Sequence, residues 1–185
     1  MTRPVFPSIV VASVMVIAAA ATAYAQPNVT ESQVKAAVIS KLVAFVEWPP
    51  AALAASRTLD LCVSGSGSLA SDLRELEVNA TVQGRVVAVR PVQREQDLAG
   101  CHVLVMSAPA SGRGTSYALL HKAASLPILT VSDGQNFLDD GGMVQLRLVS
   151  GRPRFDINDA AAQQAGLKIS SRLLGLADSV RRGRG

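Results

Sequence analysis

Aromatic side chains, histidines and cysteines are all scarce in this chain. Of its 185 residues, 4% are aromatic, two are histidine and two are cysteine, while the formal net charge is only +4. Binding to single-stranded nucleic acid needs aromatic side chains interleaved with basic ones. The densest basic run is Arg181-Arg182-Gly183-Arg184. We therefore expect no nucleic-acid partner, and interpret this run as a solvated end or a weak contact to an anionic membrane surface.

Long apolar runs are also missing, with one exception near the start. Ile9 to Ala21 is apolar, and Ala23-Tyr24-Ala25 supplies the small-x-small pattern that signal peptidase cuts. The run is short for a bilayer span. We predict a signal peptide over residues 1–25, cleaved before Gln26, and a periplasmic mature domain over 26–185. A retained membrane anchor is the alternative.

The two cysteines are Cys62 and Cys101. An even number of cysteines in an oxidising compartment favours a disulfide bond. Closing a loop of about 40 residues would stabilise the fold by about 4 kcal/mol in the chain-entropy treatment. Two buried free thiols remain the alternative, because spacing along the chain does not establish the approach of the two Cα atoms.

Strand-like and helix-like periods alternate along the mature chain. Thr30-Glu31-Ser32-Gln33 is a capping box that starts a helix, and Pro49-Pro50 ends it. Ser68 can cap a second helix that continues through Leu76. The other predicted elements are strands at 59–63, 86–89, 101–106 and 127–131 and a helix around 117–124.

The pattern changes in the last third of the chain. Apolar residues alternate over 144–148 and 154–157, with Ser150-Gly151 as a turn, and predict a β-hairpin. Asn158 can cap a final helical region that Gly166 divides into two pieces. We predict a single α/β domain with a mixed β-sheet flanked by helices, ending in a β-hairpin and C-terminal helices.

The residues give no constellation typical of an enzyme. Gly65-Ser66-Gly67-Ser68-Leu69-Ala70 fits a loose dinucleotide fingerprint, but Arg90 stands where an acidic residue is expected. We interpret the segment as an ordinary strand-to-helix turn. His102 and His121 do not form short paired-ligand motifs with the cysteines, and a nucleophile elbow is missing. We predict a non-enzymatic protein without a metal or a cofactor.

Trp48 is the only tryptophan, in the segment Phe45-Val46-Glu47-Trp48-Pro49. A tryptophan at the end of an element can fill the core or anchor a partner. We favour the core, because the first helix must bury a large side chain against the sheet.

Four groups of residues occur in order along the chain and make it resemble the YfiR family of small periplasmic proteins. They are Phe45–Pro49; Leu61–Val63 with Gly100–Leu104; Leu129–Asp133 with Phe137 and Gly141–Met143; and Arg154–Asn158 with Ala165–Leu174. The resemblance covers about residues 34–180. It implies structural or partner-facing roles for Phe45, Glu47, Trp48, Pro49, Asp133, Phe137, Gly141, Gly142, Phe155 and Asn158.

The resemblance implies an α/β domain, often dimeric, without catalytic activity. The best-known members are negative regulators that bind the periplasmic sensor region of a membrane diguanylate cyclase, and an outer-membrane lipoprotein can sequester them. Cys62 and Cys101 match a cysteine pair whose oxidation state affects stability. The alternative is a periplasmic protein that binds a small ligand near Ser64 and Ser132-Asp133, at the carboxyl ends of the strands.

The chain departs from some family members in the stretch from Asn136 to Met143. Those members carry a second cysteine pair before the hairpin, whereas this stretch contains no cysteine. We expect the turn geometry of Gly141-Gly142 and the packing of Phe137 to hold this loop instead.

Overall fold

The computed structural model describes residues 29–54, 56–65, 67–77, 81–107 and 114–183. The predicted signal peptide and its cleavage site at Ala25–Gln26 lie outside these described residues. Within them, none of the helices combines the length and the apolar character needed to cross a bilayer.

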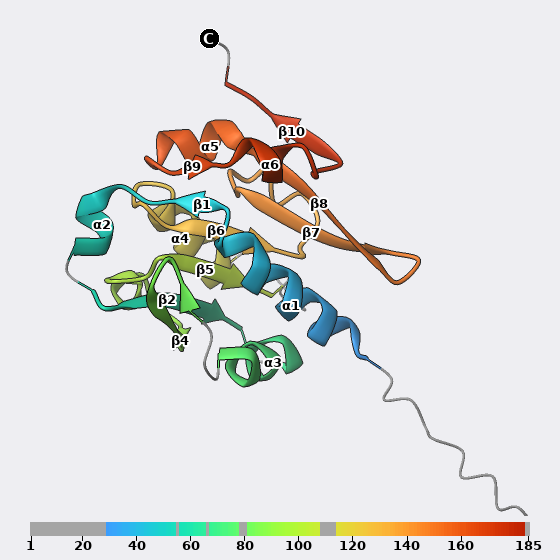
Figure 1. The fold of residues 1–185 in the computed structure, drawn as a ribbon, viewed down its shortest axis with the longest axis horizontal. Helices are drawn as coiled ribbons and strands as arrows, with labels where there is room; N and C mark the ends of the chain where they lie inside the picture. Colours follow the sequence, from blue (N-terminus) through green and yellow to red (C-terminus); the bar gives the residue numbers. More distant parts are fainter. Residues whose placement is uncertain (1–28, 55, 66, 78–80, 108–113, 184–185) are drawn as a thin grey trace, which may run out of the picture.

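A mixed eight-stranded β-sheet forms the centre of the domain (Figure 1). In spatial order its strands are β10 (Ser179–Arg181), β8 (Arg152–Asn158), β7 (Val144–Val149), β6 (Leu129–Ser132), β5 (Val103–Met106), β2 (Thr58–Ser64), β4 (Arg85–Val92) and β3 (Thr81–Val82). The run from β4 through β2, β5 and β6 to β7 is parallel. The hairpin partners β8 and β3 pair antiparallel with β7 and β4, and β10 lies parallel to β8. The predicted α/β domain with a mixed sheet and a hairpin is confirmed.

Successive side chains of the central strands point to opposite faces of the sheet, so a hydrophobic core lies on each face. Leu61 of β2 packs into the core that α1 (Glu31–Val43) and α3 (Ser68–Glu77) cover. Its neighbour Cys62 packs into the opposite core, which holds Leu119 of α4 (Gly114–Ala123) and Leu98 of the short 3₁₀ helix η1 (Glu95–Leu98). The central strands are therefore covered on both faces.

The first helix ends earlier than its sequence predicts. It stops at Val43, and Val46–Glu47 form β1, which pairs antiparallel with β9 (Lys168–Ile169) in a separate two-stranded sheet. Pro50 does not close a helix but begins a short one, α2 (Pro50–Ala54). A proline is tolerated at the first helical position because its missing N–H would have no partner there.

The region after the hairpin is also less helical than predicted. Asn158 caps α5 (Asp159–Gln164) by accepting a hydrogen bond from the Ala161 amide at 3.1 Å. Gly166, with φ of +77°, then reverses the chain into β9. The second helical piece is reduced to α6 (Ser171–Leu174), because the backbone at 168–169 is occupied by pairing with β1.

Candidate functional site

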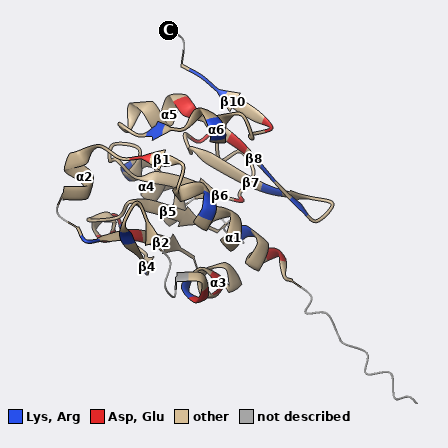
Figure 2. Cartoon of the chain, in the orientation of Figure 1, with Lys and Arg blue, Asp and Glu red and all other residues tan. Residues whose placement is uncertain are grey.

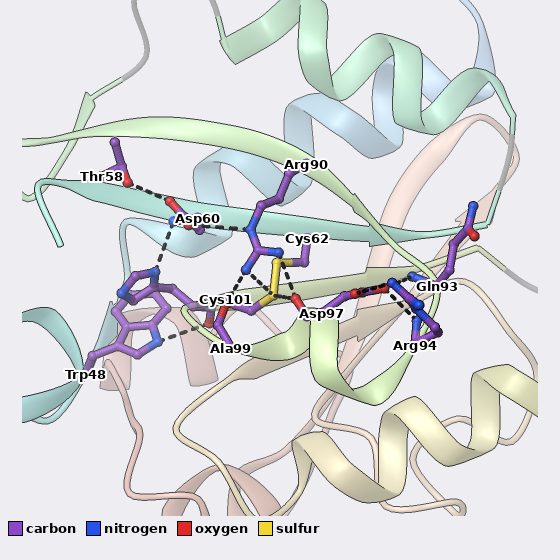
Figure 3. The surroundings of a disulfide bond; sticks show 11 residues. Trp48, Thr58, Asp60, Cys62, Arg90, Gln93, Arg94, Asp97, Ala99 and Cys101 are labelled. Carbon is purple, nitrogen blue, oxygen red and sulfur yellow. Dashed lines mark hydrogen bonds and ion pairs between the residues drawn. A yellow bond between two sulfur atoms is a disulfide. The ribbon is translucent and has the colours of Figure 1, made fainter. Parts of the chain in front are cut away.

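Cys62 and Cys101 form a disulfide bond, with their Cα atoms 5.9 Å apart (Figure 3). Cys62 lies on β2 and Cys101 in the turn that leads into β5, and both are buried. The bond closes the segment that contains β4 and η1. It confirms the predicted disulfide, and excludes the alternative of two free thiols.

Arg90 lies beside this disulfide, on the position of β4 that pairs in register with Cys62. Its guanidinium donates hydrogen bonds to the carbonyl oxygens of Asp97 at 2.7 Å and Ala99 at 2.6 Å, and lies 3.2 Å from Sγ of Cys101. Its Nε is 3.5 Å from a carboxylate oxygen of Asp60. Figure 3 shows the side chain reaching from the sheet to the turn. The hydrogen bonds of Arg90 thus stabilise this turn, a role that could not be predicted from its place in the sequence.

Asp97 holds the start of η1 within the same closed segment. Its carboxylate accepts hydrogen bonds from the backbone amides of Arg94 at 2.9 Å and Gln93 at 3.2 Å. These amide donors, that of Arg94 first, lower the pKa of Asp97 below its ordinary value of 3.8. The charged carboxylate therefore stabilises the turn.

Trp48 is a core residue, as we favoured from the sequence. It is 6% exposed, and its indole Nε1–H donates to the carbonyl oxygen of His102 at 3.1 Å. The imidazole of His102 is itself buried and accepts from the Asp60 amide at 3.0 Å through Nδ1. His121, in contrast, is exposed on α4. The Trp48 indole thus holds the segment after β1 against the start of β5, and the His102 imidazole contacts β2 and α2.

The remaining motif residues around β1 differ in exposure. Phe45 is half-buried, and the guanidinium of Arg172 lies 5.8 Å from its ring centre. Glu47 has a side chain that is 64% exposed, 3.5 Å from the ammonium of Lys168. Pro49 and Phe155 are half-buried. Glu47 is thus the motif residue of this group whose side chain is most available to a partner.

Asp133 follows β6 and joins the carboxyl end of the sheet to α1. Its carboxylate lies 2.6 Å from the ammonium of Lys35, which also contacts Glu31 at 2.5 Å. Burial alone would lower the pKa of Lys35, but the hydrogen bonds and charges of Asp133 and Glu31 outweigh it and raise the pKa above 10.5. The family motif includes Asp133 but not its partner Lys35, which lies on a different element, α1.

The loop after Asp133 is held in place without a disulfide bond, in the way that we expected from its sequence. Phe137 is buried in the core on the α4 side. Gly141 adopts φ of +95°, and the Gly142 amide donates to the Phe137 carbonyl at 2.8 Å. Glycine turn geometry and the packing of Phe137 therefore fix this loop.

Two hollows lie at the carboxyl ends of the parallel strands. Open α/β sheets usually bind ligands at this edge, beside the two neighbouring strands whose connections run in opposite directions across the sheet. In this sheet those strands are β2 and β5. The smaller hollow, of about 200 Å³, lies between the ends of β5 and β6, α4 and the loop at 134–140. The larger, of about 420 Å³, lies between the starts of α1 and α3 and includes Lys35 and Asp133. Ser64 is buried and does not line either hollow.

The glycine-rich segment at 65–70 occupies the predicted strand-to-helix turn. Gly65 has φ of +104°, and a Cβ there would lie 3.4 Å from the Cβ of Ser107. Gly67 is also in a conformation that disfavours other residues, with φ of +155°. The chain needs these glycines for the turn itself and for close approach to β5. Within the described part of the chain, no three metal-ligating side chains lie close enough together to share one ion.

The sequence pattern of the YfiR/HmsC-like family matches residues 32–178, well over half of the chain. This range includes both cysteines, the hairpin, and the segments 45–49 and 129–143. A comparison with curated proteins gives no significant match to the chain. The family is known for periplasmic regulators. The chain belongs to the YfiR/HmsC-like family.

Proposed function

We propose that this protein is an exported, non-enzymatic regulator that represses a membrane diguanylate cyclase by binding its periplasmic sensor region. The observation that carries the proposal is the family match over residues 32–178. The buried disulfide between Cys62 and Cys101 supports it, because such bonds persist in oxidising compartments such as the periplasm.

The repressor would act by binding one state of the sensor better than the other. Only differential affinity shifts such an equilibrium, and a nearly complete reversal needs about 5.5 kcal/mol. A domain that is preorganised by its disulfide and by the contacts of Arg90 would lose little conformational entropy on binding. A homodimer and sequestration by an outer-membrane lipoprotein are part of the same proposal.

We place the partner contact on the surface of β1, β9 and α6. Glu47 and Lys168 are both largely exposed there, and Leu176, in the turn after α6, is an apolar side chain that is 63% exposed. Figure 2 shows further basic positions on α6 and β10. An exposed apolar side chain with charges around it is the composition of a small protein–protein contact.

The test is the cellular level of cyclic-di-GMP in a strain that lacks this protein. Deletion should raise it, and wild type should restore it. Glu47→Lys should fail to restore it, whereas Lys122→Glu, a charge reversal on exposed α4, should restore it fully. An unchanged level on deletion, with wild type exported and folded, contradicts the proposal.

A second candidate function is periplasmic binding of a small ligand. The hollow of about 200 Å³ at the carboxyl ends of β5 and β6 favours it, because this is the usual ligand position in such sheets. A saturable rise in melting temperature with a small molecule, without any protein partner, is the expected result.

A further inference from the structure

Among the residues that the structure describes, the lining of the smaller hollow carries charge of one sign only. It is formed by Met106 and Ser107 after β5, by Ser116, Tyr117 and Leu120 of α4, and by the loop residues Ser132, Gly134, Gln135, Asn136, Phe137 and Asp140. Asp140 is the charged side chain in this set, which contains no lysine, arginine or histidine. A phosphate or carboxylate ligand would therefore meet like charge from this described lining.

The loop that carries Asp140 is fixed before any ligand arrives. The Ser132 hydroxyl donates to the Met106 carbonyl at 2.7 Å and accepts from the Gly134 amide at 3.0 Å. The Asp140 amide donates to the Asn136 carbonyl at 3.0 Å. Because the backbone is already ordered, binding there would cost little loop entropy.

Two lining groups, Asp140 and Tyr117, have no side-chain partner among the described residues. Within the described residues, Asp140 forms no salt bridge, whereas the neighbouring Asp139 pairs with Arg181 at 2.7 Å. Tyr117 is 48% exposed, and its hydroxyl has no hydrogen-bond partner among the same residues. A carboxylate and an open aromatic ring are the two groups that recognise an ammonium ion.

We propose that this hollow binds a small organic amine. Its ammonium group is held by the Asp140 carboxylate and the Tyr117 ring, and its apolar part lies against Leu120 and Phe137. The volume of about 200 Å³ is below the roughly 300–1,000 Å³ of sites for drug-sized ligands, so the amine is small. The inference rests on the second candidate function, and does not depend on the cyclase proposal.

The test uses three probes of similar size and different charge: 2-phenylethylamine, 2-phenylethanol and phenylacetate. Titration calorimetry and thermal shift at pH 7 on the mature protein should show saturable binding of the amine, with weak or no binding of the other two. Asp140→Asn and Tyr117→Leu should each weaken amine binding about fivefold or more. Asp139→Asn is the matched control, and should bind the amine like wild type.

Each other outcome contradicts a defined part of the inference. Equal amine binding by Asp140→Asn, with its fold verified by circular dichroism, overturns the placement of the ammonium group. Preference for the alcohol or the carboxylate overturns the amine class and leaves the small-ligand function standing. No saturable binding of any probe overturns the amine proposal and counts against the small-ligand function itself.

Discussion

A Cβ atom at Gly142 would lie 2.2 Å from Cε1 of Phe137. The aromatic ring therefore occupies the space that any side chain at position 142 would need. The contact cannot be relieved cheaply, because Phe137 is buried in the core on the α4 side of the sheet.

The substitution Gly142→Ala should lower the free energy of unfolding by about 1–3 kcal/mol, the usual cost of overpacking. Urea unfolding followed by the fluorescence of Trp48, the only tryptophan, measures it. Gly114→Ala is the control, because a Cβ there meets no atom of the described residues within 4 Å. Equal stability of Gly142→Ala and wild type would contradict the packing argument.

Removal of the disulfide should destabilise the domain substantially. Cys62→Ser breaks the bond across a sequence separation of 39 residues, which corresponds to about 4 kcal/mol in the chain-entropy treatment. Thermal melting under non-reducing conditions should show a lower midpoint for the variant, and reductant should bring wild type close to it. An unchanged melting curve of the variant would refute a structural role for the bond.

Trp48→Phe should cost about 1–2 kcal/mol of folding stability. The phenyl ring is smaller than the indole and lacks its N–H, so packing and one of the two hydrogen bonds to the buried His102 carbonyl are lost, while the Leu129 amide still donates to it at 2.9 Å. Urea unfolding followed by far-UV circular dichroism is the measurement, since the variant lacks tryptophan. Tyr117→Phe, which removes a hydroxyl without a partner in the described structure, should change stability by less than about 0.5 kcal/mol.

The stabilisation provided by Asp97 should depend on pH in the acid range. Its pKa is lowered in the folded state, so the contribution is complete above the unfolded value of 3.8 and is lost as the pH falls through the folded value. The melting temperature of wild type should exceed that of Asp97→Asn at pH 6, and the two should converge as the pH falls below 3.8. A difference that stays constant down to pH 2 would contradict this origin.

The central sheet was predictable because its signals are local. The apolar strand 101–106 was expected to be covered on both faces, and Val103–Met106 are all buried. Ser150-Gly151 was expected as the hairpin turn, and both residues have positive φ, +51° and +72°. These features depend on neighbouring residues and on standard turn geometry.

The errors occur where a distant segment decides the conformation. Val46–Glu47 form a strand only because Lys168–Ile169 lie beside them, more than 100 residues later. The candidate site shows the same limit. Asp133 carried a sequence signal, whereas Lys35 and Arg90 acquire their roles from contacts with other elements.

The pairing of β1 with β9 joins two segments that are far apart in the sequence, which has a consequence for folding. A chain that emerges amino end first exposes 46–47 long before 168–169 are available. Until then β1 has no partner strand, and contacts of such high sequence separation form slowly because the loop between them must first close. We therefore expect the pairing of β1 with β9 to form late in folding, after residues 168–169 have been synthesised.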